Sequence, residues 1–347
     1  MHMADALVSP AAGGAMWAAS LGAVAYSAHK VRQDLDERKV PLMGVLGAFV
    51  FAAQMINFSI PGTGSSGHLG GGLLLAILLG PFAGFLTMAS ILTVQALFFA
   101  DGGLLALGCN IFNLGFFTCF ITYPLIFKPF WRKSDSPKAL LTGTILAAIL
   151  GLQFGAFGVV LETICSGLAT LPFKTFILLM QSIHLAIGLV EGLVTAAVII
   201  FIRQARPEIL ACAAAGKSIG KINLKRVLIG LAAATAILGG ALSWFASAYP
   251  DGLEWSLFHA TGKEELATEI RLHQTLARVQ ERTAFLPDYG FRKTVNAAKE
   301  RPAAAEAVRP AVDGGTSLAG IIGGLMTLIF AGGLGILLWF TKKRLPQ

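Results

Sequence analysis

The residues best suited to chemistry stand at the start of the chain, in Met1-His2-Met3. A free α-amine on Met1, the backbone amide nitrogen of His2 and Nδ1 of the His2 imidazole can chelate one cation through two small rings. Three nitrogens nearly in one plane suit tetragonal Ni(II) or Cu(II), whereas Mg(II) and Ca(II) prefer oxygen ligands. The first residues therefore predict part of a nitrogen-ligated metal site.

A fourth nitrogen would have to come from another segment, and the Gly-rich stretch 62–72 contains His68. The spacing alone leaves two interpretations open, because a histidine at position 2 of an arbitrary chain more often belongs to a frayed terminus. No signal-peptide pattern precedes the first apolar run, so we expect the Met1 amine to survive in the mature protein.

The composition is that of an integral membrane protein. The 347 residues are 55% hydrophobic and 13% charged, with a mean hydropathy of +0.71, whereas soluble domains are about 25% charged. The net charge of +8 is therefore interpreted as membrane topology, and no nucleic-acid partner is expected. The four cysteines lie in or beside apolar runs without a CxxC spacing, which predicts packing residues rather than a disulfide or zinc site.

The apolar runs predict an all-α membrane protein with a core of seven helices and two further membrane helices. The runs are 10–28, 41–57, 69–99, 104–127, 139–160, 173–202, 227–246 and 317–340. One helix over 69–99 would be about 46 Å long, too long for one span of about 30 Å and too short for two. The Gly80-Pro81 break therefore predicts two short or tilted helices there.

Lys and Arg predict the orientation, because cytoplasmic loops are enriched in both. The short loops that carry neither are placed outside together with the N-terminus, which puts His2 and His68 on one side; these loops are 58–68, 100–103 and 161–172. The polar segment 247–316, with a helix expected from Lys263 to about Arg282, is also placed outside, since long segments translocate regardless of charge.

The Gly-rich stretch before His68 supplies irregular backbone near membrane depth. Such backbone is tolerated only where it is buried in protein or lines a cavity, so we expect this stretch to fold over another group. Polar side chains in the apolar runs line a cavity or join helices by hydrogen bonds, namely Gln54, Asn57, Gln95, Asn110 and Asn113. His184 and Glu191 share one helix face, and either orient packing or serve transport.

Three segments of this sequence resemble the CbiM/NikM family, the substrate-binding subunits of cobalt and nickel energy-coupling-factor transporters. The resemblance covers roughly 1–205 and is found in Met1 to Pro10, in Ile60-Pro-Gly-Thr through His68-Leu-Gly-Gly71, and in Gln95 to Gly103. It implies that the Met1 amine, His2 and His68 bind the metal. Many members begin Met-His-Ile-Pro-Asp-Gly, so positions 3, 4 and 6 differ here, while His2 and Asp5 are kept.

A second resemblance concerns Pro250-Asp-Gly-Leu-Glu254, which is similar to the PDGLE motif of the small NikN-type subunit. We therefore expect a metal-binding core (1–205), a basic cytoplasmic linker (206–226) and a fused NikN-like domain (227–347). The linker sequence 211–218 matches a phosphate-binding loop only loosely, so we expect no bound ATP.

The function implied is capture of Ni(II) or Co(II), as transported substrate, in the membrane of a bacterial or archaeal cell. No catalytic residue is expected, and the family implies partners: a transmembrane coupling (T) subunit and ATPase subunits. Cobalt uptake for cobalamin biosynthesis is the main alternative. An intramembrane metalloenzyme, which would need an open coordination position and a general base, and a carrier that works alone are further alternatives.

Overall fold

The computed structural model describes residues 2–34, 36–133, 136–168, 171–215, 223–263, 266, 270–292 and 314–343. Among these residues the fold is helical apart from one antiparallel hairpin, formed by β1 (Phe58–Ile60) and β2 (Ser65–Gly67). The Met1 amine, a member of the expected chelate, lies outside the described residues, so its role stays a prediction.

The first part of the chain forms a helical bundle whose helices follow the expected apolar runs. After the 3-10 turn η1 (Asp5–Leu7) come α1 (Pro10–Asp34), α2 (Lys39–Gln54), α3 (Gly72–Leu79), α4 (Pro81–Phe99), α5 (Leu107–Ile111), the π-helical segment η2 (Phe112–Phe127), α6 (Lys128–Lys133), α7 (Pro137–Ser166) and α8 (Phe173–Ala205). Helix α7 begins with Pro137 behind an N-cap at Ser136, whose hydroxyl accepts a hydrogen bond from the Ala139 amide at 3.1 Å.

The C-terminal segment, residues 223–343 where described, adds shorter helices and one long one. Helix α9 (Pro207–Ala215) precedes it, and the segment contains α10 (Lys225–Gly240), η3 (Leu242–Phe245), α11 (Gly252–Thr261), α12 (Arg271–Thr283), η4 (Pro287–Tyr289) and α13 (Gly314–Lys343). The helix expected to begin at Lys263 begins instead at Arg271. The preceding helix α11 ends at Thr261, and the following Gly262 has a φ of 78°, the left-handed conformation that glycine favours at a helix C-terminus.

The expected break at Gly80-Pro81 is confirmed, because it separates α3 from α4. Gly80 has a φ of 84°, and Pro81 is the first residue of α4, where its missing amide hydrogen has no cost. Helix α3 has eight residues and spans about 12 Å, so it does not cross a membrane by itself. The irregular stretch before it is buried in protein, as expected: Ser65 and Ser66 have no exposed surface and His68 is 9% exposed.

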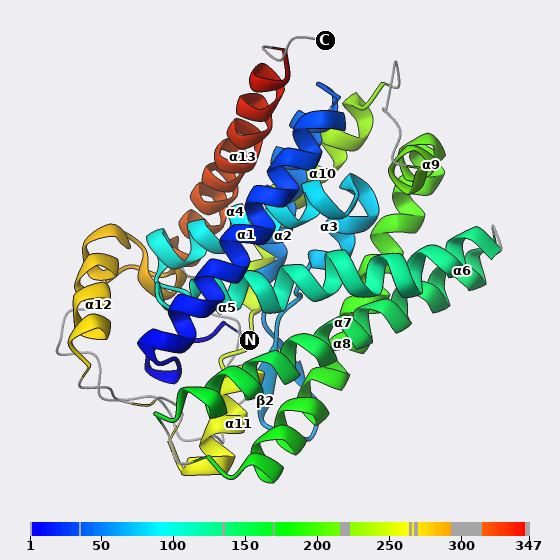
Figure 1. Ribbon diagram of the computed structural model, residues 1–347. Coiled ribbons are helices and arrows are strands. Elements are labelled where there is room, and N and C mark those ends of the chain that lie inside the picture. The colour runs from blue at the N-terminus through cyan, green and yellow to red at the C-terminus, as the bar shows by residue number, and fades with distance from the viewer. Residues whose placement is uncertain are drawn as a thin grey trace.

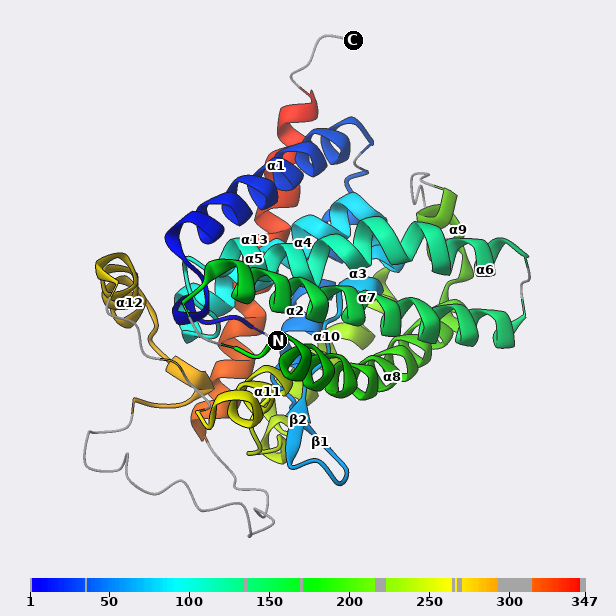
Figure 2. The ribbon, with the colours of Figure 1, turned by 60° about the horizontal axis from the view of Figure 1, so that its bottom comes forward.

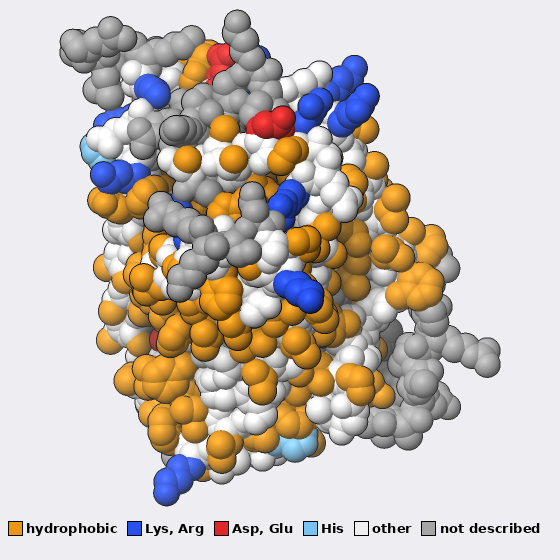
Figure 3. All heavy atoms as spheres, turned by 90° about the vertical axis from the view of Figure 1, so that its right-hand side faces the viewer, with side chains coloured by type: hydrophobic (Ala, Val, Ile, Leu, Met, Phe, Trp, Pro, Cys, Tyr) orange, Lys and Arg blue, Asp and Glu red, His pale blue; other side chains and the backbone are white. Residues whose placement is uncertain are grey.

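The chain is a multi-pass membrane protein. Five of its described helical stretches are long and apolar enough to cross a membrane: Pro81–Phe99, Leu107–Trp131, Pro137–Ser166, Phe173–Ala205 and Gly314–Lys342. Large apolar side chains on α8 and α13 are exposed, among them Leu178 at 67% and Leu337 at 60%, as lipid contact would require. Hydrophobic side chains also cover the middle of the face in Figure 3, and Lys and Arg lie mainly in its upper part.

The C-terminal segment packs closely on the bundle. Helices α10 and α13 pack against α2 and against each other, α11 packs against α8 and β2, and α12 contacts α4. Helices α7 and α8 form the long antiparallel pair seen in Figures 1 and 2. The start of the chain lies near the middle of the molecule, close to α11 and β2 in both views. The C-terminal segment is therefore positioned to contact any site that the N-terminus helps to form.

Candidate metal centre

The first residues of the chain are fixed in place, which excludes a frayed terminus for the described residues from His2 onward. Met3 has no exposed surface, and its amide donates to Oδ1 of Asn110 at 2.8 Å. The Met3 carbonyl accepts from Nδ2 of Asn110 at 3.2 Å and from the Gly103 amide at 2.9 Å. Asn110 therefore binds the backbone of the N-terminus, a role that its place in an apolar run did not reveal.

Asp5 fastens the same segment to the loop between α4 and α5. Its Oδ1 accepts from the Leu105 amide at 2.8 Å and the Ala106 amide at 2.9 Å. Burial raises the pKa of Asp5, and these two amide donors oppose that rise. Gly103 lies so close to Asp5 that a Cβ at this position would overlap the carboxylate. The glycine is therefore required by the close approach of the N-terminus.

The structure brings together the two described residues of the expected ligand set. The rings of His2 and His68 stack with centroids 4.9 Å apart and planes 10° apart. Nδ1 of His68 lies 3.1 Å from the Leu69 carbonyl, so a hydrogen on Nδ1 leaves the lone pair on Nε2. Burial lowers the pKa of His68 to about 3, which keeps the ring neutral, as a metal ligand must be.

Asp101 is a member of this centre that sequence reasoning did not single out. Its Oδ1 lies 2.9 Å from Nδ1 of His2, and its Oδ2 accepts from the Tyr289 hydroxyl at 2.5 Å. Burial would raise the pKa of Asp101, but the charge of His2 and hydrogen bonds from His2 and Tyr289 lower it to about 2. The carboxylate therefore faces the nitrogen that the expected chelate would use.

The loop that carries His68 is held from two sides. Glu191 on α8 accepts from the Gly70 amide at 2.8 Å and the Gly71 amide at 3.0 Å. Nε2 of Gln54 donates to the Gly70 carbonyl at 2.8 Å, and Gln95 supports Gln54 by a bond of 3.0 Å. Glu191 is thus bonded to the loop that carries His68 rather than paired with His184. Gln54 and Gln95 join helices α2 and α4 by a hydrogen bond, which is one of the two roles expected for polar side chains in the apolar runs.

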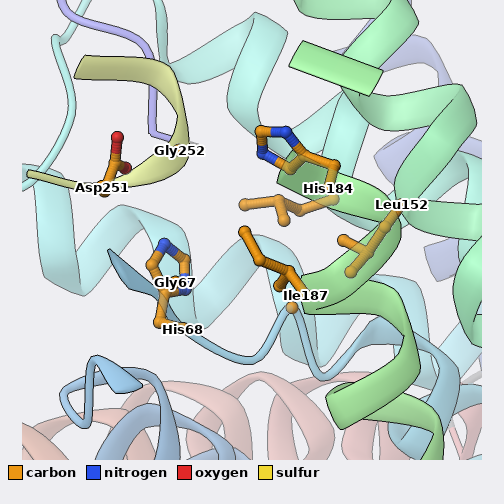
Figure 4. A pocket seen from close by; sticks show the side chains of 9 residues that line it. Gly67, His68, Leu152, His184, Ile187, Asp251 and Gly252 are labelled. Atoms are coloured by element: carbon orange, nitrogen blue, oxygen red, sulfur yellow. The ribbon is translucent and has the colours of Figure 1, made fainter. Parts of the chain in front are cut away.

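His184 lines a small cavity beside the centre. Its Nδ1 lies 2.7 Å from the Met180 carbonyl, and its buried Nε2 has no hydrogen-bond partner among the described residues. His68, His184 and Asp251 approach this cavity from the loop after β2, from α8 and from the start of α11 (Figure 4). No group of three His, Cys, Asp or Glu side chains in the described part of the chain is arranged to hold a metal ion.

The PDGLE-like motif has a structural role that explains its residue types. Asp251 caps α11 by accepting from the Leu253 amide at 2.8 Å and the Glu254 amide at 2.9 Å, while Glu254 accepts from the Asp251 amide at 3.1 Å. This reciprocal capping box fixes the start of the helix. The Pro250 carbonyl accepts from the Ser66 amide at 2.8 Å, so the motif is attached to the strand that leads into His68.

The fold and the site together define a helical membrane protein with a buried histidine pair at an anchored N-terminus. Residues 2–209 match the family described as the cobalt uptake substrate-specific transmembrane region (CbiM), and residues 225–339 match the PDGLE domain. The chain therefore belongs to the CbiM family of membrane proteins and also carries a PDGLE domain.

Individual relatives agree with this assignment. A putative fused nickel transport protein NikMN of Archaeoglobus fulgidus is 37% identical over 217 residues, which are 60% of this chain and 68% of the relative. A putative metal transport protein of Haloquadratum walsbyi is 36% identical over 60% of this chain and 93% of its own length. The crystal structure of a truncated transition metal transporter superposes with a TM-score of 0.52 and 29% identity over 59% of this chain and 99% of that chain.

Proposed function

We propose that the protein is the metal-capture subunit of an ATP-driven energy-coupling-factor importer for Ni(II) or Co(II). The observation that carries the proposal is the buried pairing of His2 with His68 at 4.9 Å behind an anchored N-terminus. The ligands are the Met1 amine, the His2 amide nitrogen and imidazole, and the His68 imidazole. The Met1 part of this set rests on the resemblance and on chelate chemistry.

The described geometry pairs His2 with Asp101. The two rings are stacked rather than directed at one point, and Nδ1 of His2 faces Asp101. Binding therefore requires His2 to exchange Asp101 for the metal ion, whereas His68 is already neutral. Four nitrogen ligands near one plane favour nickel, and cobalt uptake is the alternative that the family description supports.

The remaining parts of the proposal concern direction and energy. A separate coupling subunit and ATPase subunits supply the energy, and the N-terminus with its metal centre faces away from the cytoplasm of a bacterial or archaeal cell. Nickel uptake by the purified chain alone in sealed vesicles, without any ATPase, would instead support a carrier that works by itself. A metalloenzyme is disfavoured, because the family and its relatives are described by metal uptake and transport.

The test compares the same short tag placed before Met1 and after Gln347. An N-terminal tag turns the Met1 amine into a peptide amide, whose lone pair is delocalised into the carbonyl, so stoichiometric nickel should be lost from the purified protein. The C-terminal tag should be harmless. Equal nickel content in the two tagged proteins would refute the ligand set.

A side-chain variant tests the second half of the ligand set. His68→Ala should lose high-affinity nickel while the chain still folds, as judged by thermal unfolding. His29→Ala is the matched control, because His29 lies on α1, away from the centre, and its Nε2 lies 3.0 Å from Gln33. Retained stoichiometric nickel in His68→Ala would overturn the proposal.

A further inference from the structure

We infer that Tyr289 of the C-terminal segment is a positioning residue for the metal centre: it holds Asp101 so that the His2 imidazole can exchange this carboxylate for a metal ion. The inference rests on the proposed function and adds a regulatory role for the PDGLE domain. It starts from a chain of two contacts, in which the Tyr289 hydroxyl donates to one oxygen of Asp101 and the other oxygen meets Nδ1 of His2.

Asp101 and the metal ion compete for the same nitrogen. Nδ1 of His2 lies 2.9 Å from Oδ1 of Asp101, and the same nitrogen closes the expected chelate ring with the His2 amide. It cannot face both partners at once, so every capture event breaks the contact between His2 and Asp101. The other ring nitrogen, Nε2, is buried and has no hydrogen-bond partner among the described residues, so the contact with Asp101 and the stacking on His68 fix the ring orientation.

Tyr289 reduces the hold of Asp101 on His2. A hydroxyl that donates to one carboxylate oxygen draws negative charge toward itself, and less charge remains on the oxygen that faces His2. Without the hydroxyl, more of the charge of this partly buried carboxylate would be available to His2. Asp101 is only 23% exposed, so water replaces the missing donor incompletely.

The backbone around Tyr289 is strained in the manner of a functional position. Asp288 and Tyr289 have φ values of 51° and 59°, in the left-handed region that residues other than glycine rarely adopt. Such a conformation is unfavourable for a residue with a side chain and persists only where surrounding contacts enforce it. The ring of Tyr289 stacks on Phe99 at 5.2 Å and meets the edge of Phe51 at 6.1 Å. These contacts fix the aromatic ring, and the hydroxyl reaches Asp101.

A second residue of the C-terminal segment secures the same loop. Nε2 of Gln280 on α12 donates to the Ala96 carbonyl at 2.8 Å and the Gly102 carbonyl at 2.7 Å. Gly102 follows Asp101 directly and has a φ of 81°, so this bond fixes the backbone that carries the carboxylate. The C-terminal segment thus contacts the Asp101 side chain through Tyr289 and the backbone next to Asp101 through Gln280.

The test is the variant Tyr289→Phe, which keeps the stacked ring and removes only the hydroxyl. Nickel association measured by stopped flow, and nickel affinity measured by titration calorimetry on the full chain, should each fall at least about ten-fold, the lower end of the range expected for a hydrogen bond to a charged group. Tyr249→Phe is the control, because the contact of Tyr249 with the core uses its backbone carbonyl, which accepts from Ser66. Thermal unfolding checks that both variants fold.

A double-mutant cycle separates positioning from general destabilisation. In an Asp101→Asn background, Tyr289→Phe should lower nickel affinity by less than about two-fold, because the negative charge on which the hydroxyl acts is gone. Unchanged or tighter nickel binding by Tyr289→Phe, or the same ten-fold loss in both backgrounds, would overturn the inference. If the wild-type chain binds neither nickel nor cobalt, the proposed function itself fails, which is a different result.

Discussion

Glu191 offers the sharpest test of how the fold holds the loop that carries His68. Its two oxygens accept from the Gly70 and Gly71 amides at 2.8 and 3.0 Å, and the side chain is 1% exposed. The conservative variant Glu191→Gln keeps the shape but turns one acceptor into an NH2 group facing an amide donor. One hydrogen bond is lost, and a buried donor is left without an acceptor.

The expected magnitude follows from these contacts. A hydrogen bond to a charged group contributes about 1.5–3 kcal/mol, and a buried unsatisfied donor adds a cost of about 1–3 kcal/mol. The free energy of unfolding should therefore fall by about 2.5–6 kcal/mol. Since each 1.4 kcal/mol corresponds to ten-fold in affinity, nickel affinity should fall at least about ten-fold if the loop has to be ordered again on binding.

The assay is equilibrium nickel titration at fixed pH together with thermal unfolding. Glu162→Gln is the matched control, because Glu162 is a half-buried carboxylate on α7 that accepts from Asn113 at 2.7 Å and does not hold the loop. Gln54→Ala removes the hydrogen bond to the Gly70 carbonyl and should also lower nickel affinity. Equal nickel affinities for Glu191→Gln and Glu162→Gln would refute the reasoning.

Two further predictions concern the pH dependence of stability and the orientation of the chain in the membrane. Because burial lowers the pKa of His68 from 6.5 to about 3, the unfolded chain binds a proton there that the folded chain excludes, and the free energy of unfolding should fall as pH drops from about 6.5 toward 3. His68→Gln should show a shallower slope in thermal unfolding, and equal slopes would contradict the burial argument. In a Cys165→Ser background, Lys263→Cys should react with an impermeant thiol reagent in intact cells and Lys138→Cys should not; the reverse labelling would overturn the orientation.

Signals in consecutive residues of the sequence predicted the positions of several helices. Apolar runs located α7, α8 and α13, and the Gly80-Pro81 pair located the boundary between α3 and α4, because these signals are written in consecutive residues. The predicted start of α12 was wrong: α11 ends at Thr261, before the expected start at Lys263, and α12 begins eight residues after Lys263, at Arg271. The burial of the stretch before His68 followed from its glycine content and its place beside an apolar run.

The metal centre could be predicted only in part. His2 and His68 stand out because histidine is rare in this chain and both fall in segments that resemble the family. Asp101, Asn110 and Tyr289 depend on contacts between residues far apart in the sequence, such as the 2.5 Å bond from Tyr289 to Asp101. Neither periodicity nor spacing carries that information, and the strained backbone at Tyr289 is visible only in three dimensions.

The centre is assembled from segments that separate helices hold in place. Glu191 on α8 holds the His68 loop, Asn110 on α5 holds the N-terminus, and the Tyr289 hydroxyl binds Asp101 and weakens its hold on His2. Metal affinity in such a site depends on how well each segment is ordered before the ion arrives. A segment that is already ordered loses no further conformational entropy on binding, so it does not weaken the affinity. Coupling of this kind is reciprocal, so a partner that moves α8 or the C-terminal segment must change metal affinity, and metal must change the affinity for that partner by the same factor.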